Sequence, residues 1–167
     1  MDVTLDSRPR FSVIIATYNY AHFLSRVLAS VFAQTYTRYE VLVIDDGSTD
    51  NTIDTLRREY PDIVLFEESQ RGVSAARNRG IQASRGDWIA FLDSDDWWTA
   101  DKLQVCFEVI NDKVDLVYHD LEIVSEPTEK EMVVIIYAEA VEALKIGGKT
   151  SHYPLYLPDE LHSSRPE

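Results

Sequence analysis

Five short apolar runs, separated by segments of helical character, constrain the fold of this 167-residue chain more than any other feature. The runs are rich in β-branched and aromatic residues and nearly continuous in hydrophobicity, which is typical of strands covered on both faces. We predict strands at residues 11–16, 41–45, 63–67, 88–93 and 116–120. Five strands of this kind favour a buried parallel sheet.

The segments between the runs predict helices. In the first of them, apolar side chains recur at the spacing of one helical face. The predicted helices lie at residues 22–34, 48–60, 72–84 and 99–111. Ser48, Thr49 and Asp50 are candidate N-caps of the second helix, and Thr99 is the predicted N-cap of the fourth. The alternation of strand and helix predicts an α/β fold with a mainly parallel sheet flanked by helices.

The pattern weakens beyond Val124. Residues 132–138 predict an edge strand, and residues 138–149 predict a short helix that ends at Gly147 and Gly148. The last residues contain three prolines without periodicity, which indicates an extended tail. We therefore divide the chain into an N-terminal extension, a main domain, a divergent strand and helix segment, and a tail: residues 1–10, 11–124, 125–148 and 149–167.

Charge and composition narrow the classes of function. The formal net charge of −13 argues against nucleic acid as a partner. The sequence shows neither an apolar run of membrane-spanning length nor a secretory signal pattern, so we expect a cytoplasmic protein, with a peripheral position at the inner face of the membrane left open. Cys106, the single cysteine, lies among apolar residues of a predicted helix and is expected to be a buried structural thiol.

Unusual polar residues follow three of the predicted strands. The sequences ATYN, DDGSTD and DSDD stand at residues 16–19, 45–50 and 93–96. In parallel α/β sheets, ligands collect at the carboxyl ends of the strands. Arg71, Arg77 and Arg79 form a basic cluster between the third and fourth strands. These residues predict a binding site for an anionic ligand at this edge of the sheet.

Asp93 and Asp95 are the candidate metal ligands. They are one residue apart at a strand end, so their oxygens can reach one point, and Mg²⁺ or Mn²⁺ binds one or two carboxylates together with phosphate oxygens and water. The alternative is a capping turn in which Asp95 or Asp96 supports the following helix. Asp45 and Asp46 pose a similar choice, because a turn needs only one of them. The second could accept hydrogen bonds from a base edge or a ribose.

Other residues in these motifs leave their roles open. Arg77 and Asn78 could be surface residues, although their grouping with Arg79 favours a binding role for Arg77. Trp97 and Trp98 could pack in the core or form a rim for a sugar ring. The four histidines lack metal-ligand spacing and receive no role.

Taken in order, the motifs SVIIATYN, VLVIDDGSTDNT, GVSAARNRGI and GDWIAFLDSDDWW resemble the signature of family 2 glycosyltransferases with the Rossmann-like GT-A fold. The resemblance covers roughly residues 11–124, which would form the nucleotide-sugar-binding domain. It implies transfer of a sugar from a nucleoside diphosphate sugar, with a UDP-sugar as first choice, to a hydroxyl acceptor with inversion. The acceptor would be a glycan, a polysaccharide or a lipid-linked compound, and the cofactor Mn²⁺ or Mg²⁺.

The resemblance also implies roles for single residues. It suggests that Ala16 and Tyr18 contact the nucleobase while Asp46 bonds its edge. Along the donor it places Ala75, Arg77 and Asn78, with Asp93 near the ribose or metal and Asp95 on the metal. Ala16 departs from the family, which commonly has proline there; this concerns backbone shape.

The family's acceptor half and its catalytic carboxylate have no convincing counterpart in this sequence. Asp159 and Glu160 are adjacent acids in the tail, but their surroundings differ from the family's acidic element. The catalytic base is therefore unknown. Two functions remain open: an active glycosyltransferase, or an inactive or truncated relative that only binds nucleotide-sugar.

Three other families fit less well. A haloacid dehalogenase phosphatase requires Thr or Val where Trp97 stands. A response-regulator receiver requires a phosphoacceptor Asp at the end of the third strand, where the sequence offers Glu67 and Glu68. A dehydrogenase would need a glycine-rich GxGxxG turn after the first strand, which the sequence lacks.

Overall fold

The structure is a computed structural model that describes residues 10–119, 122–125, 132–136 and 141–144, with side chains for residues 10–118. Its helices are α1 (Ala21–Phe32), α2 (Thr52–Glu59), α3 (Val73–Ala83) and α4 (Lys102–Val109). Its first five strands are β1 (Phe11–Thr17), β2 (Tyr39–Asp45), β3 (Val64–Glu67), β4 (Trp88–Asp93) and β5 (Trp97–Trp98). Its other strands are β6 (Leu116–His119), β7 (Glu122–Ser125), β8 (Met132–Ile136) and β9 (Val141–Leu144).

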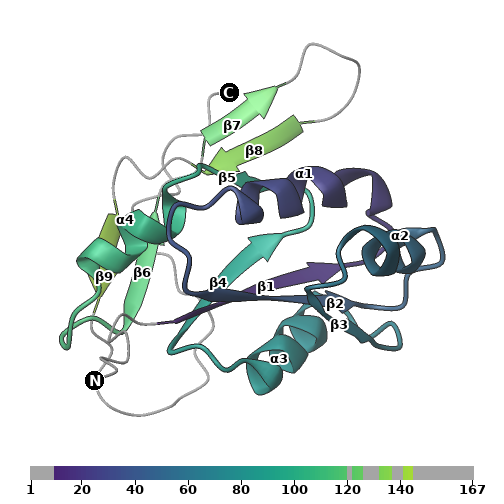
Figure 1. Cartoon of the computed structure of the whole chain (residues 1–167), viewed down its shortest axis with the longest axis horizontal. Coiled ribbons are helices and arrows are strands. Elements are labelled where there is room, and N and C mark those ends of the chain that lie inside the picture. Colours follow the sequence, from purple (N-terminus) through teal and green to yellow (C-terminus); the bar gives the residue numbers. More distant parts are fainter. Residues whose placement is uncertain (1–9, 120–121, 126–131, 137–140, 145–167) are drawn as a thin grey trace, which may run out of the picture.

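The centre of the fold is a four-stranded parallel sheet in the order β3-β2-β1-β4 (Figure 1). In its register, Val13 of β1 is opposite Val41 of β2 on one side and Ala90 of β4 on the other. The prediction of a parallel α/β sheet is confirmed. All four of its strands begin within two residues of the predicted positions, because long apolar runs mark buried strands clearly.

Helices cover both faces of this sheet, with α1 on one face and α3 on the other (Figure 1). Successive residues of β1 point to opposite faces, so Val13 and Ile15 pack with residues of α1, α2 and α4, whereas Ile14 packs with Ala76 of α3. Both sets are almost fully buried. The apolar stripe of α1 is buried at Leu24, Val27, Leu28 and Val31.

Gly80 lets α3 lie close to the sheet. A Cβ atom at this position would lie 2.5 Å from Cγ2 of Ile14 and 2.9 Å from Cδ1 of Ile44. A larger residue would therefore push the helix away from β1 and β2. This close contact fixes the height of α3 above the strand ends that form the candidate site.

The fifth predicted strand is real but does not join the parallel sheet. β6 pairs antiparallel with β9, with Leu116 opposite Leu144. The prediction of a helix at residues 138–149 is wrong where the structure describes them, because residues 141–144 are strand β9. Pairing with β6 gives hydrogen-bond partners to backbone N–H and C=O groups. In a short helix, many of these groups would lie at the helix ends and remain unpaired. Gly147, Gly148 and the tail of residues 149–167 lie outside the described residues.

The strand predicted at residues 132–138 exists as β8, but it is not an edge strand. It lies between β5 and β7 in a second sheet of order β5-β8-β7. β8 pairs parallel with β5 and antiparallel with β7. The apolar run of this strand is consistent with a central position, because a central strand has partners on both sides.

The predicted helix caps are wrong in detail. Helix α4 begins at Lys102, so Thr99 precedes the N-cap position of Asp101. The buried amide of Gln34 supports this helix start, because its Oε1 accepts from the backbone N–H of Leu103 at 2.8 Å. Its Nε2 donates to the carbonyl oxygen of Thr99 at 2.6 Å. A side chain from the loop after α1 therefore replaces the local cap.

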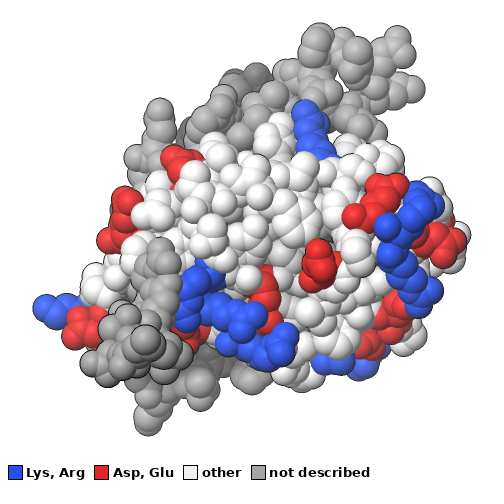
Figure 2. Space-filling view, viewed as in Figure 1, with Lys and Arg blue, Asp and Glu red and all other residues white. Residues whose placement is uncertain are grey.

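On the face shown in Figure 2, acidic and basic side chains lie beside one another rather than in separate patches. Cys106 is buried in the core, as predicted, and burial raises the pKa of its thiol. Within the described part of the chain, each helix is too short or too polar to span a bilayer.

Candidate functional site

A cavity of about 360 Å³ lies at the carboxyl ends of β1, β2 and β4, beside the start of α3. Its lining residues come from the loops after these strands and from one face of α3: Ala16, Thr17, Tyr18, Tyr20, Asp46, Val73, Ala76, Arg77, Asp93, Ser94 and Asp95. The position agrees with the rule that ligands bind at the carboxyl ends of parallel strands. Most of the motifs that the sequence singled out therefore meet in one place.

Six of the eight predicted site residues line this cavity: Ala16, Tyr18, Asp46, Arg77, Asp93 and Asp95. The other two, Ala75 and Asn78, line a neighbouring cavity of about 240 Å³. The two cavities share Asp46 and Ala76. Ala75 and Asn78 therefore lie next to the main cavity and outside its lining.

Asp46 holds the loop that leads into α3. Its carboxylate is buried and accepts hydrogen bonds from two backbone N–H groups, Arg71 to Oδ1 at 2.8 Å and Gly72 to Oδ2 at 2.7 Å. Its own N–H donates to the carbonyl oxygen of Thr17 at 2.8 Å. Asp46 thus joins three of the segments that surround the cavity. Each carboxylate oxygen keeps a further acceptor position for a ligand.

The sequence indicated that one of Asp45 and Asp46 would form a turn, and the structure shows that this residue is Asp45. Its Oδ2 accepts from the backbone N–H groups of Gly47 and Ser48, at 3.1 and 2.8 Å. Gly47 has a φ of 83°, a conformation that favours glycine. The two neighbouring acids therefore have separate tasks, because Asp45 shapes the turn while Asp46 crosses to the loop before α3.

Asn19 connects the loops after β1 and β2. Its Oδ1 accepts from the backbone N–H groups of Thr49 and Asp50, at 2.7 and 3.2 Å. Its own N–H donates to Oγ of Ser48 at 2.8 Å. The N-cap of α2 is Asn51, so the candidate caps Ser48, Thr49 and Asp50 precede it, although Oδ1 of Asp50 accepts from the backbone N–H of Thr52, the first residue of the helix, at 3.0 Å. Asn19 has a φ of 58°, in the left-handed region that asparagine tolerates better than most residues.

Arg77 and Asp93 both line the cavity and contact each other directly. Nη2 of Arg77 donates a hydrogen bond to Oδ1 of Asp93. Both side chains are partly exposed, at 35% and 52%. The guanidinium has further N–H donors, so it can also bind an anionic ligand in the cavity.

The acids after β4 repel one another. Burial, and after it the negative charges of Asp95 and Asp93, raise the pKa of Asp96 to about 6. The capping alternative is wrong, because β5 separates these acids from α4 and the N-cap of that helix is Asp101. A cation placed between the carboxylates would relieve this repulsion.

The donor chemistry at this strand end fits a hard divalent cation. Asp93 and Asp95 line the cavity with carboxylate oxygens, which are ligands of Mg²⁺ and Mn²⁺. Among the described residues, His, Cys, Asp and Glu side chains form no group of three or more that could enclose a metal ion. Ligand oxygens and water would therefore have to complete the coordination.

The structure decides two alternatives that the sequence left open. Trp98 is 4% exposed and belongs to the core. Trp97 is half-buried, and Cζ of the Arg26 guanidinium lies over its ring, 3.7 Å from the ring centroid. Neither tryptophan lines the cavity. Arg79 forms an ion pair with Glu68 and packs over the ring of Phe66, so Arg77 is the arginine of the basic cluster that lines the main cavity.

Sequence reasoning missed five lining residues: Thr17, Tyr20, Val73, Ala76 and Ser94. Thr17 and Ser94 stand directly beside predicted residues, so a rule that includes the neighbours of strand ends would have found them. The hydroxyl of Thr17 is buried and lacks a hydrogen-bond partner among the described residues. Val73 and Ala76 carry no chemical signal, and only the position of α3 brings them to the cavity.

The pattern of the family described as "Glycosyl transferase family 2" matches residues 12–155. An uncharacterized glycosyltransferase of Nostoc sp. is 44% identical over 117 residues, which are 66% of this chain and 36% of the relative. The UDP-Glc:α-D-GlcNAc-diphosphoundecaprenol β-1,3-glucosyltransferase WfgD of Escherichia coli is 37% identical over 118 residues, 68% of this chain and 46% of the relative. The chain thus spans less than half the length of these relatives.

Two solved structures have a similar fold. A mannosyltransferase from Pyrobaculum calidifontis, in complex with GDP-Man and Mn²⁺, is 32% identical with a TM-score of 0.59 over 65% of this chain and 34% of its own. TarS of S. aureus (residues 1–349), in complex with UDP-GlcNAc, is 29% identical with a TM-score of 0.53 over 58% of this chain and 30% of its own. Since the family pattern covers most of the chain and the parallel sheet agrees with these GT-A structures, this protein belongs to glycosyl transferase family 2.

Proposed function

We propose that the chain binds a nucleoside diphosphate sugar in the cavity at the ends of β1, β2 and β4, and that the sugar is transferred to a hydroxyl acceptor with inversion. The observation that carries this proposal is the meeting of six predicted residues from four sequence motifs around one cavity. The nucleotide-sugar complexes of the two similar structures support a donor of this class. A UDP-sugar is our first choice, supported by the names of WfgD and of the TarS complex.

The nucleobase would lie near Ala16, Tyr18 and Asp46. Asp46 presents a buried carboxylate whose oxygens already accept backbone N–H groups, so it is held in place before a ligand arrives. Such an acceptor fits a base edge that offers an N–H, as uracil and guanine do, and it disfavours an edge that offers only a ring acceptor. Ala75 and Asn78 would contact the donor from the neighbouring cavity.

Asp95 and Asp93 would hold Mn²⁺ or Mg²⁺ together with diphosphate oxygens. The cation supplies charge stabilisation for the diphosphate leaving group. Arg77 adds positive charge on the same side of the cavity, because its guanidinium hydrogen-bonds Asp93 and lines the cavity. An acidic protein can in this way bind an acidic donor.

The acceptor hydroxyl needs a base within hydrogen-bond reach. We assign that role to none of the described residues. A glycan, a polysaccharide or a lipid-linked compound is the proposed acceptor class. WfgD, whose name includes a diphosphoundecaprenol-linked acceptor, supports the last of these.

The test is calorimetric titration of UDP in the presence of Mn²⁺ with the wild type, Asp95→Asn and Asp62→Asn. Asp62 is an exposed acid outside the cavity and serves as a matched control for the loss of one charge. We expect Asp95→Asn to weaken UDP binding by at least about tenfold, as loss of a metal ligand does. Unchanged affinity in Asp95→Asn, with metal present, would remove Asp95 from the proposed site.

Release of UDP from a UDP-sugar, measured with and without Mn²⁺, tests catalysis separately from binding. We expect turnover that requires both the metal and Asp95. Tight, Asp95-dependent UDP binding without turnover would restrict the chain to a nucleotide-sugar-binding module. That outcome contradicts the proposed transfer activity while it leaves the binding site intact.

A further inference from the structure

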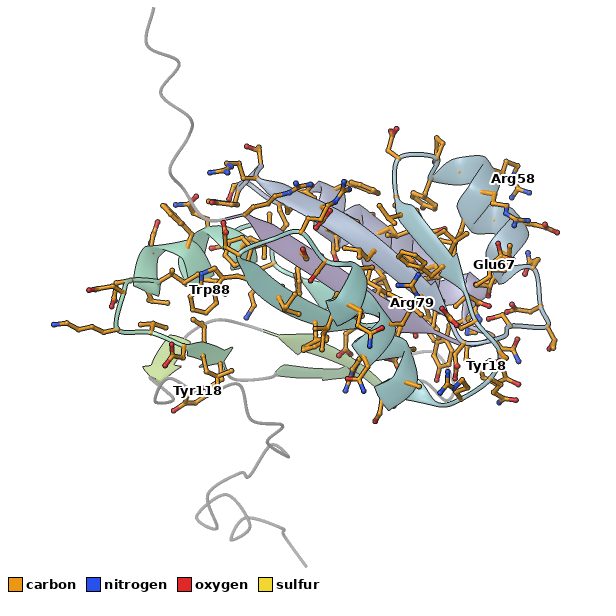
Figure 3. The ribbon with its side chains drawn as sticks, turned by 90° about the horizontal axis from the view of Figure 1, so that it is seen from below. Tyr18, Arg58, Glu67, Arg79, Trp88 and Tyr118 are labelled. Carbon is orange, nitrogen blue, oxygen red and sulfur yellow. The ribbon has the colours of Figure 1, made fainter. Side chains whose placement is uncertain are left out.

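A second and larger cavity, of about 710 Å³, lies between β4, α4 and β6. It shares no lining residue with the candidate donor cavity. Figure 3 places Trp88 and Tyr118, which line it, at the opposite end of the sheet from Tyr18, which lines the donor cavity. Its volume is within the usual range for small-molecule sites, which is roughly 300–1,000 Å³. It is therefore a separate candidate site.

The wall of this second cavity is largely apolar and aromatic, with Trp88, Phe91, Trp98 and Leu103 among its lining residues. Phe91 is 45% exposed although it lies on a strand of the central sheet. Apolar surface of this kind favours a ligand with an apolar body.

Two residues of this wall carry buried hydrogen-bond donors without an acceptor among the described residues. Lys102 is 3% exposed, and its Nζ has no hydrogen-bond partner among the described residues. The indole Nε1 of Trp98 is also buried without a partner there. A buried amine usually extends its charged end to water or pairs with an acid, because an unpaired buried charge is costly. Burial accordingly lowers the pKa of Lys102 to about 8.

The chemistry of these two groups indicates what is missing. An ammonium and an indole N–H both donate hydrogen bonds and accept none, so the complementary group is an acceptor. A carboxylate accepts hydrogen bonds from either kind of donor and neutralises the ammonium. Asp87 and Asp115 also line the cavity, but both are exposed, and Oδ2 of Asp87 accepts from the backbone N–H of Arg10. These two acids disfavour a ligand with several negative charges.

We propose that the second cavity binds an amphipathic monocarboxylate, with its apolar chain among Trp88, Phe91 and Leu103 and its carboxylate on Lys102 and Trp98. The site is distinct from the proposed nucleotide-sugar site and does not depend on it. A nucleoside diphosphate does not fit, because it is a polyanion with a polar body. A fatty acid of medium length has both required features.

Tryptophan fluorescence gives a direct readout, because Trp88 and Trp98 are two of the three tryptophans in the chain. We would titrate the intact chain with decanoate, decanol and decylammonium, which share an apolar chain and differ in the polar group. We expect decanoate to bind at least about tenfold more tightly than decanol, and decylammonium most weakly, since one charge-assisted hydrogen bond accounts for such a factor. Equal affinities, or no fluorescence change with any of the three, would overturn the proposal.

Lys102→Met tests the role of the amine. Methionine keeps much of the apolar length of lysine, so we expect the variant to fold and to bind decanoate and decanol equally. Retention of the decanoate preference in a folded Lys102→Met variant would contradict the proposal. Asp95→Asn separates the two sites: we expect it to lose UDP affinity and to keep the decanoate preference. Loss of both would show that the two cavities are not independent, which also contradicts the proposal.

Discussion

The guanidinium of Arg77 donates a hydrogen bond to the carboxylate of Asp93 in the lining of the cavity at the carboxyl ends of the strands. Helix α3 supplies the arginine and strand β4 supplies the aspartate. Arg77 is thus in direct contact with one of the proposed metal ligands, and its remaining N–H donors can contact the diphosphate. Because both side chains are partly exposed, the pair contributes little to stability by itself.

We expect Arg77→Ala to weaken UDP binding in the presence of Mn²⁺ by about 10- to 100-fold, because a charge-assisted hydrogen bond contributes roughly 1.5–3 kcal/mol. The free energy of unfolding should change by less than about 1 kcal/mol. Calorimetry and urea denaturation measure the two quantities. Arg57→Ala is the matched control, since Arg57 forms an exposed ion pair with Glu67 outside the cavity. Equal loss of affinity in both variants would argue against a specific role for Arg77.

Asp46→Asn should destabilise the protein by about 1–3 kcal/mol, because an amide replaces one of the two acceptor oxygens with a second donor. That donor would face the backbone N–H of Arg71 or Gly72 in a buried position. Urea denaturation measures the loss. The exposed Asp62→Asn control should stay within about 0.5 kcal/mol of the wild type. A stable Asp46→Asn variant would show that the loop before α3 does not depend on this carboxylate.

The contribution of Asn19 divides into backbone conformation and hydrogen bonding. Asn19→Gly removes the side-chain acceptor but tolerates the φ of 58°, whereas Asn19→Ala loses the acceptor and also strains the backbone. We expect both variants to be less stable than the wild type, with alanine lower than glycine by about 1 kcal/mol. Thermal unfolding measures the order. If alanine is the more stable of the two, the left-handed conformation is not what this position requires.

Glu40 should govern part of the acid stability. Although burial opposes it, hydrogen bonds from Ser12 and Arg85, with the charge of Arg10, hold the pKa of Glu40 below its ordinary 4.5. The contribution of Glu40 to the stability of the folded state is therefore fully present above its unfolded-state pKa. This contribution is lost as the pH falls through the lowered folded-state pKa. Glu40→Gln should cost about 1.5–3 kcal/mol at neutral pH and should flatten the stability profile below pH 4.5. Urea denaturation from pH 7 to pH 3 gives both curves, and parallel curves would contradict this assignment.

A thermal-shift panel tests the metal and the base together. We expect UDP with Mn²⁺ to raise the melting temperature most, ahead of GDP and dTDP, and a chelator to abolish the shift. At a ligand concentration of 100 times Kd, binding stabilises the folded state by about 2.7 kcal/mol. A shift that survives the chelator would contradict metal-dependent donor binding. A larger shift with GDP than with UDP would indicate that guanine, rather than uracil, is the preferred base.

The sequence predicted most of the central fold, because buried parallel strands need long apolar runs that few other elements share. Elements outside the central sheet were predicted less well, because their sequences carry weaker local patterns. The sequence of residues 141–144 contains good helix formers, yet pairing with β6 makes them a strand. Thr99 has the chemistry of a cap, yet Gln34, which follows α1 and is distant in the sequence, supports the start of α4. Long-range contacts of this kind leave no local pattern.

For the candidate site, the sequence by itself determined which chemical groups stand at the strand ends, since acids and glycines that follow apolar runs can be read directly from the sequence. Only the tertiary structure decided what each group does. It assigned Asp45 to a turn and Asp46 to the loop before α3, and it directed Arg77 rather than Arg79 into the cavity. The physical reason is that hydrogen-bond partners far apart in the chain become neighbours only when the helices pack on the sheet.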